Sequence, residues 1–155
     1  MCGPLRAHVD GPHKCGPYNY DMDIISIDTH GREQLIDITD LVQRVVASSG
    51  VAEGLCHLWC RHTTAGLTVN ENADPDVIRD ILMALDRIVS DAWPYTHAEG
   101  NSPAHVKSSL LGCQLTIPIV EGRIALGTWQ GVLFAEFDGP RAGRKIMVTV
   151  IPSGL

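Results

Sequence analysis

The sequence predicts an α+β fold, a single domain in which a mixed or antiparallel sheet is layered with helices. Residues 38–46 and 76–90 carry apolar side chains at the spacing of amphipathic helices, whereas residues 113–151 alternate or run apolar as strands do. A chain of 155 residues that is 45% hydrophobic can also build one substantial core. We therefore expect one domain over residues 21–155.

The first twenty residues are expected to differ from the rest. They contain three prolines and three glycines but no apolar period. Proline and glycine interrupt regular structure, and terminal segments are often poorly held. We therefore expect residues 1–20 to form a loosely held N-terminal tail.

The first half of the domain is predicted to contain two strands around one helix. Residues 22–27 have the pattern of a strand, and the apolar residues at 38–46 recur at i, i+3, i+4, i+7 and i+8, which predicts a helix that ends before Gly50. Its cap is expected to be Asp37, Thr39 or Asp40. Residues 55–60 are then predicted to form a fully buried strand that delivers Arg61 and His62 to its end.

The second half is predicted to begin with helices and to end with strands. Residues 76–90 form the clearest helix, because Asp74 can cap it, Pro75 suits its first turn and its apolar residues make one stripe. A shorter helix is expected from Ser102 or Pro103 to Leu111. The predicted strands are residues 113–119, a hairpin partner at 123–129, and then 132–137 and 145–151.

The overall charge and the apolar runs limit the classes of partner. The formal net charge is -6 and no basic run is present, so we expect no nucleic-acid partner. No apolar stretch approaches the ~20 residues that cross a bilayer, and no signal-type segment is seen, so we expect no membrane partner and a cytoplasmic location. Five scattered cysteines, an odd number, indicate reduced thiols, with Cys56 and Cys60 as small buried hydrophobes.

Three segments concentrate polar, chemically capable residues at the ends of predicted elements: residues 62–74, 97–108 and 127–141. We expect folding to bring all three to one pocket. In the first segment, His62 and Thr63 follow a strand. Glu71 could act as a base or bind a metal ion, because a helix cap does not require it. For Asn72 and Asp74, a role in the site and a purely structural role at the start of a helix explain the residues equally well.

The second segment offers His97 and His105, with Asn101 and Ser108 close by. Together with His62 these two histidines could form a metal site, but the spacing is not itself a zinc signature. Three hydrogen-bonded histidines are the favoured explanation of the pattern.

In the third segment Glu136 lies on an apolar strand face, where a carboxylate needs a partner. A structural pair with Arg141 or Arg144 and a role in an active site explain Glu136 equally well. Trp129 could belong to the core or could stack on a ring. Arg141 could clasp a phosphate or a carboxylate.

Several motifs, in this order, resemble those of the YjbQ family, whose members are described as secondary thiamine-phosphate synthases. The motifs are His62-Thr63-Thr64-Ala65, Glu71-Asn72-Ala73-Asp74-Pro75, His97, Asn101 with Ala104-His105, Ser109-Leu110-Leu111-Gly112, Gly127-Thr128-Trp129-Gln130 and Glu136-Phe137-Asp138-Gly139-Pro140-Arg141. The resemblance runs from about Asp21 to Ile151. The sequence departs from the family pattern in the short loop at residues 99–103, where Glu99 is the only acidic residue.

The resemblance implies a compact α+β fold that assembles as a homotrimer, with the motif residues gathered in a pocket near the subunit boundary. It also implies an activity, the joining of a hydroxymethylpyrimidine pyrophosphate to a thiazole phosphate with release of pyrophosphate. A divalent metal, Mg or Zn, would help to neutralise the leaving group. The alternatives are a metal-dependent hydrolase and a non-catalytic trimeric binding module for a phosphorylated metabolite.

The candidate residues can be matched to these functions. The expected catalytic residues are His62, Glu71 and Glu136. The expected substrate-binding residues are Thr63, Asn70, Asp74, Asn101, Ser108, Trp129, Gln130 and Arg141. The expected metal ligands are His62, His97 and His105.

Overall fold

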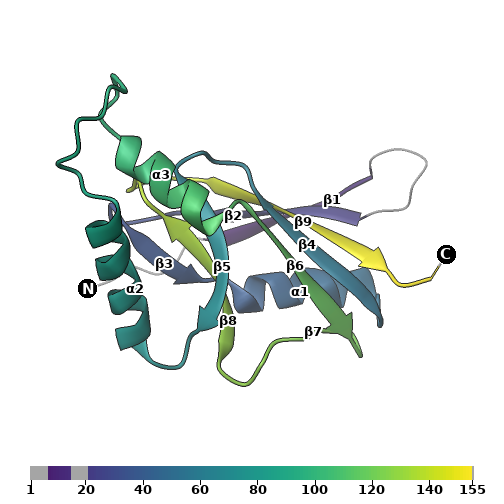
Figure 1. Ribbon diagram of the computed structural model, residues 1–155. Helices are drawn as coiled ribbons and strands as arrows, with labels where there is room; N and C mark the ends of the chain where they lie inside the picture. The colour runs from purple at the N-terminus through teal and green to yellow at the C-terminus, as the bar shows by residue number, and fades with distance from the viewer. Residues whose placement is uncertain (1–6, 15–20, 155) are drawn as a thin grey trace.

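The computed structural model describes residues 7–14 and 21–154. Within these ranges the chain forms strands and helices in the following order: β1 (Ala7–Lys14), β2 (Asp21–Ile27), β3 (Gln34–Asp37), α1 (Thr39–Ser49), β4 (Gly54–Cys60), β5 (Ala65–Glu71), α2 (Pro75–Ile88), α3 (Ser102–Leu111), β6 (Gln114–Val120), β7 (Arg123–Ile124), β8 (Gln130–Glu136) and β9 (Arg144–Pro152). The predicted α+β fold is confirmed (Figure 1). None of the described helices has the length and apolar character needed to span a membrane.

The strands form two sheets, and every pair of neighbouring strands is antiparallel. The larger sheet has the order β1-β2-β9-β4-β6-β7, and the smaller one has the order β3-β8-β5. Sequence neighbours such as β4 and β5 therefore lie in different sheets. This division decides where the polar segment between β4 and α2 is placed.

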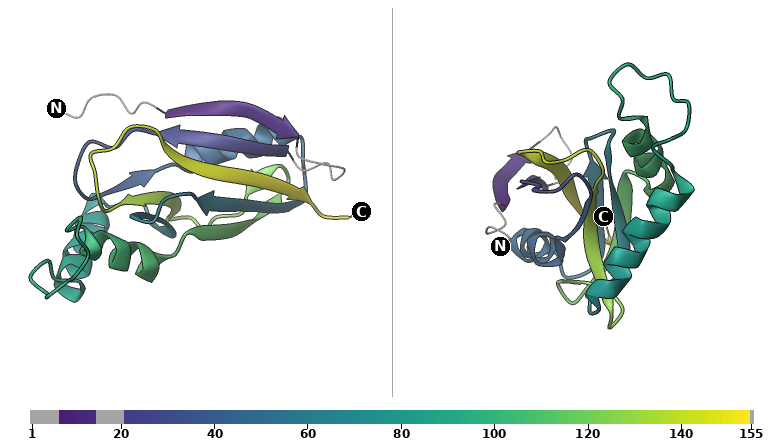
Figure 2. Two further views of the ribbon diagram at one scale, coloured as in Figure 1. Left: turned by 90° about the horizontal axis from the view of Figure 1, so that it is seen from above. Right: turned by 90° about the vertical axis from the view of Figure 1, so that its left-hand side faces the viewer.

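The molecule is built in layers around the smaller sheet. Side chains of α1 and of both sheets form the main core, so α1 packs against the inner side of the sheets. Helices α2 and α3 cover the other face of the smaller sheet and enclose a second apolar cluster (Figure 2). Strand β8 contributes to both clusters, with Val132 and Phe134 in the first and Leu133 and Ala135 in the second.

Helix α2 follows the sequence prediction closely. Asp74 caps it, since its Oδ1 accepts a hydrogen bond of 2.9 Å from the backbone N–H of Asp76, and Pro75 occupies the first turn. The apolar stripe faces the smaller sheet, with Leu85 buried, whereas Ile88 at the end of the helix is 58% exposed. Local capping and periodicity were therefore sufficient to place this element.

Other elements differ from the prediction. Part of the segment expected to be a loose tail, residues 7–14, forms β1, which pairs with β2 at the edge of the larger sheet and shifts register between Asp10 and His13. A proline is tolerated at such an irregular edge because no ladder hydrogen bond has to be donated there. Residues 1–6 and 15–20 lie outside the described residues. Strands β3 and β5 were not predicted, and β7 is much shorter than expected.

Strand β4 is buried on one face only, so the prediction of a fully buried strand was wrong. Cys56, Leu58 and Cys60 point into the core, whereas Leu55 and Trp59 on the outer face are each 42% exposed. This alternation is typical of an antiparallel sheet with one free face.

Candidate functional site

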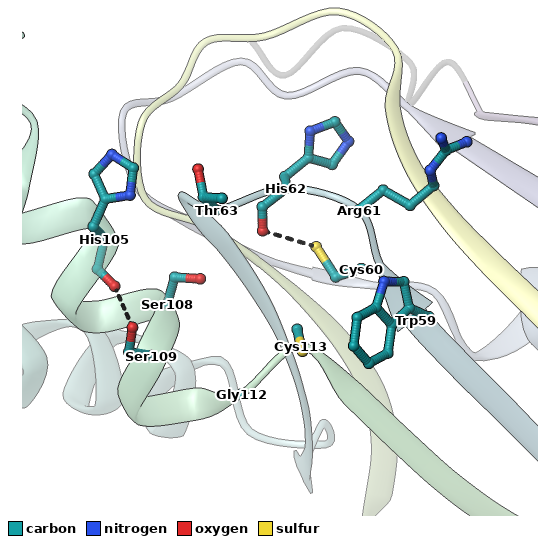
Figure 3. A pocket seen from close by; sticks show the side chains of 10 residues that line it. All are labelled: Trp59, Cys60, Arg61, His62, Thr63, His105, Ser108, Ser109, Gly112 and Cys113. Atoms are coloured by element: carbon teal, nitrogen blue, oxygen red, sulfur yellow. Dashed lines mark hydrogen bonds between the residues drawn. The ribbon is translucent and has the colours of Figure 1, made fainter.

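A cavity of about 670 Å³ lies where β4 ends beside helix α3. Cavities of this size bind small molecules. Figure 3 shows that its wall is built from the end of β4 and the residues after it, from α3, and from Gly112 and Cys113, which connect α3 to β6. The lining residues are Trp59, Cys60, Arg61, His62, Thr63, His105, Ser108, Ser109, Gly112 and Cys113.

His62 is held in one tautomer by the backbone of the neighbouring strand. Its Nε2 accepts a hydrogen bond of 2.7 Å from the backbone N–H of Lys145, so the proton of the neutral ring is on Nδ1. Burial lowers the pKa of His62, and the guanidinium of Arg144 acts in the same direction. At neutral pH the ring is therefore an uncharged hydrogen-bond donor through Nδ1, and Nε2 is already used.

We expect the imidazole of His62 to titrate below 6.5, its ordinary pKa. Above pH 6.5 neither the folded nor the unfolded state binds this proton, whereas between 6.5 and the lower native pKa only the unfolded state binds it. His62 therefore makes the folded protein less stable as the pH falls through that window. Ring-nitrogen NMR should show an unprotonated Nε2 and a titration midpoint below 6.5, with His62→Gln assigning the signal. A midpoint above 6.5 would contradict this arrangement.

Helix α3 supplies the second imidazole of the cavity. His105 borders the same hollow as His62 and Thr63 (Figure 3). Ser108 also lines it, but its hydroxyl donates to the carbonyl of Ala65 over 2.7 Å and so fastens α3 to β5. The predicted role of Ser108 as a hydrogen-bond donor to phosphate therefore does not fit, because its proton is already used.

His97 lies next to His105 but outside the main cavity. The two rings meet edge to face with centroids 5.4 Å apart, and both border a smaller hollow of about 350 Å³. His62 is absent from that hollow, and its Nε2 accepts the backbone hydrogen bond described above. Over residues 7–14 and 21–154, no group of three or more His, Cys, Asp or Glu side chains is arranged to hold a metal ion. The predicted three-histidine site thus does not fit the side chains of a single chain.

Glu136 is fully buried and forms a structural ion pair. Its Oε2 accepts a hydrogen bond of 2.6 Å from Nε of Arg144 and another of 3.1 Å from Oγ1 of Thr29, and Oε1 accepts from Nη2 of Arg144 at 2.5 Å. The backbone N–H groups of Phe137 and Asp138 also donate to Oε1. Glu136 does not line the cavity, so the structural explanation of this residue is supported and its predicted catalytic contact with substrate is not.

Arg141 and Asn101 meet at Asp138, beside the start of α3. Nη2 of Arg141 donates to Oδ2 of Asp138 over 2.7 Å, and Nδ2 of Asn101 donates to the same atom over 3.2 Å. Burial alone would raise the pKa of Asp138, but these two hydrogen bonds hold it below its ordinary value. Arg141 is exposed, and Oδ1 of Asn101 is buried without a hydrogen-bond partner.

The remaining predicted residues lie at the opposite end of β5. This strand has seven residues and spans roughly 20 Å, with Ala65 beside the cavity and Glu71 at the far end. There Glu71 pairs with Gln130, and the backbone N–H of Asn72 donates to the carbonyl of Trp129. Figure 1 shows the β5–α2 and β7–β8 connections together at this end. A single chain thus does not bring all predicted residues into one pocket: Asn70, Glu71, Asp74, Trp129 and Gln130 form a separate group.

Six cavity residues were not predicted as part of a site: Trp59, Cys60, Arg61, Ser109, Gly112 and Cys113. Trp59 and Cys113 were missed. Cys60 was expected to be a buried hydrophobe, Arg61 was noted only as following a strand, and Ser109 and Gly112 were noted only within a motif. The alternation of β4, in which Trp59 shares the outer face with Leu55, is the sequence signal that could have placed the indole at the surface. Cys113 carries no such signal, because its position depends on the pairing of β4 with β6.

Comparison with known proteins identifies relatives over most of the chain. Residues 23–153 match the family model described as UPF0047 protein YjbQ-like. A UPF0047 protein of Methanocaldococcus jannaschii is 50% identical over 125 residues, which cover 81% of this chain and 90% of that protein. The UPF0047 protein YugU of Bacillus subtilis is 45% identical over 120 residues, which cover 76% of this chain and 89% of that protein.

Solved structures show the same fold. A crystal structure of an uncharacterised YjbQ/UPF0047 protein from Clostridium acetobutylicum matches with a TM-score of 0.80 and 52% identity, covering 83% of this chain and 98% of that chain. A YbjQ-like protein of unknown function from Sulfolobus solfataricus matches with a TM-score of 0.83 and 30% identity, covering 94% of this chain and all of that one.

Proposed function

This chain belongs to the UPF0047 YjbQ-like family, and we propose that it is a homotrimeric transferase of the thiamine-phosphate-synthase type. The reaction would join a hydroxymethylpyrimidine pyrophosphate to a thiazole phosphate and release pyrophosphate. The observation that carries the proposal is the cavity beside α3, which gathers imidazole, guanidinium and hydroxyl groups but is lined by no carboxylate among the described residues.

Such a cavity suits the departure of pyrophosphate. The bond between the pyrimidine methylene and a pyrophosphate oxygen breaks, and the thiazole nitrogen bonds to the methylene carbon, so no carboxylate base is needed to remove a proton. His62, whose Nδ1–H is not used by the backbone hydrogen bond, and Arg61 both line the cavity. In this proposal they bind the oxygens of the pyrophosphate, on which negative charge develops as it leaves. The half-exposed Trp59 offers an aromatic face for a ring of either substrate.

Within a single chain the hydrolase alternative has less support. It needs a carboxylate base, for which Glu71 and Glu136 were the candidates. Glu136 is neutralised by Arg144 behind the cavity, and Glu71 lies at the other end of β5. Neither reaches the described lining of the cavity in one chain.

The absence of an acid–base pair from that lining favours a second candidate, a non-catalytic trimeric module that binds a phosphorylated metabolite. It predicts retention of ligand without turnover. A ligand at 100 times its dissociation constant should stabilise the protein by about 2.7 kcal/mol, which a thermal-shift screen of phosphorylated compounds detects.

We expect the purified protein to form thiamine phosphate from the two phosphorylated precursors when Mg²⁺ or Zn²⁺ is supplied. His62→Ala should lower kcat roughly 100-fold, because it removes one preorganised donor from the developing charge. His57→Ala is the matched control, since His57 lies on β4, the strand that leads to His62, outside the cavity and beside Thr116. Absence of product from folded wild-type protein, or equal rates for His62→Ala and wild type, would refute the transferase proposal.

We also propose that the trimer joins the two separated groups of motif residues, so that the Trp129 end of one subunit, which also carries Glu71 and Asp74, completes the cavity of the next; the cavity lacks a carboxylate only as a single chain builds it. His62→Ala and Trp129→Ala should each retain only about 1% of the activity when alone. If subunits of the two variants mix at random, roughly a quarter of the sites in the trimers would have both halves intact and regain activity. His62→Ala mixed with His105→Ala is the control, because both changes lie on the cavity side. If neither mixture regained activity, the proposal of a shared site would be wrong.

A further inference from the structure

Two cysteines face each other across the β4–β6 pair in the cavity wall. The register places Trp59 opposite Gln114, so the next pair is Cys60 and Cys113, and the backbone N–H of Cys60 donates to the carbonyl of Cys113 over 2.7 Å. Residues directly opposite on antiparallel strands share one face, and in a hydrogen-bonded pair their Cα atoms are about 5.5 Å apart. That separation lies within the range of about 4.4–6.8 Å that a disulfide spans.

The two thiols differ in access to solvent. Cys113 is partly exposed in the cavity, whereas Cys60 is 3% exposed and its Sγ lies 3.8 Å from the carbonyl oxygen of His62. Burial raises the pKa of the Cys60 thiol, so Cys60 is poorly suited to attack a reagent from solvent. Cys113 therefore meets a small molecule in the cavity first.

We propose that Cys60 and Cys113 form an oxidisable dithiol that a low-molecular-weight disulfide converts to a disulfide in the wall of the cavity. This inference goes beyond the proposed transferase activity and does not depend on it. It rests on the register of the two strands, on the shared cavity, and on the difference in exposure between the two thiols.

The oxidation proceeds in two balanced steps. The thiolate of Cys113 attacks one sulfur of the reagent, forming a mixed disulfide and releasing one thiolate of the reagent. Cys60 then loses its proton and attacks the sulfur of Cys113, which releases the second half of the reagent. Two protein thiols are oxidised to one disulfide, and one reagent disulfide is reduced to two thiols.

The disulfide would alter the cavity, because Cys60 contacts the residue His62 and Cys113 lies next to the end of α3. Cys60 would leave its contact with the carbonyl of His62. Cys113 follows Gly112, whose N–H donates to the carbonyl of Ser108 at the end of α3 and whose carbonyl accepts from Leu67. The new bond therefore ties the wall that carries His62 to the end of the helix that carries His105.

The test uses the full chain with Cys2 and Cys15 replaced by serine, so that three cysteines remain. After incubation with oxidised glutathione, non-reducing digestion and mass spectrometry should find a peptide pair linked through Cys60 and Cys113, on a protein two hydrogens lighter. Dithiothreitol should reverse the change. Cys56→Ser is the matched control and should form the same link, because Cys56 is fully buried and burial raises its pKa to about 12.

Two single variants separate the steps. Cys60→Ser should accumulate glutathione on Cys113, since no second thiol can displace it, whereas Cys113→Ser should acquire neither an adduct nor a disulfide. The inference is overturned if the native protein forms no Cys60–Cys113 link under conditions that oxidise the chain in urea. It is also overturned if Cys60→Ser gains no glutathione at Cys113. Both results are independent of whether thiamine phosphate is formed, so failure here leaves the transferase proposal standing.

Discussion

Replacing Arg144 with methionine is expected to lower the free energy of unfolding by about 3–5 kcal/mol, because it leaves the carboxylate of Glu136 buried without its counter-charge. Glu136 is fully buried and Arg144 is 7% exposed, so solvent cannot replace the lost guanidinium. Arg144 also donates to Oγ1 of Thr64 over 2.9 Å, which joins the strand ends behind the cavity. Urea denaturation followed by circular dichroism measures the change.

The chain provides a matched control for this prediction. Arg141 makes a similar pair with Asp138, but its side chain is 53% exposed, so Arg141→Met should cost far less than Arg144→Met. The double variant Glu136→Gln with Arg144→Met removes both charges and should recover part of the loss. If Arg144→Met were no more harmful than Arg141→Met, the pair would not be the buried anchor described above.

Replacing Lys107 with methionine is expected to cost about 3 kcal/mol, because this lysine on α3 is fully buried between two carboxylates. Its Nζ donates to Oε1 of Glu33 over 2.6 Å and also contacts Asp86 of α2. Asp86 is largely exposed and can be hydrated, whereas Glu33 has one oxygen buried without a partner. The cost therefore comes mainly from Glu33, which places the effect at the low end for a broken buried pair.

The pH dependence of this second effect distinguishes it from lost packing. Burial already raises the pKa of Glu33, and removal of Lys107 takes away the opposing ammonium. Protonation neutralises the stranded carboxyl, so the deficit of Lys107→Met should shrink as the pH falls from 7 towards 4.5, the ordinary pKa of a glutamate. Arg79→Met, which breaks an exposed pair with Asp76, is the control and should stay within about 1 kcal/mol. A deficit that does not change with pH would show that lost packing is the cause.

Local signals predicted the elements whose formation depends on local chemistry. Helix α2 was found because Asp74, Pro75 and the apolar stripe are all within one segment. Strand β8 was found because its apolar run is buried on both faces. Strands β3 and β5 were missed because they are short or end in polar residues such as Asn70, and their extended form depends on pairing with β8. No local pattern contains that information.

The site could be predicted in part. The sequence identified His62, Thr63, His105 and Ser108, which do line one cavity, but it treated residues 62–74 as one polar segment. Because β5 runs through that segment, its two ends are carried to opposite ends of the smaller sheet. The partner of Glu136 was left open between two arginines, and the connection from β8 to β9, which lie in different sheets, places Arg144 against it.

Strand β8 also determines how the molecule unfolds. Because its alternate side chains belong to different apolar clusters, neither cluster can open without exposing one face of the strand that the other cluster still holds. The helical layer and the large sheet therefore share a common wall and are joined in one cooperative unit of unfolding. A destabilising substitution near α2 therefore also lowers the stability of the strands behind His62, and its effect is not confined to the outer helices.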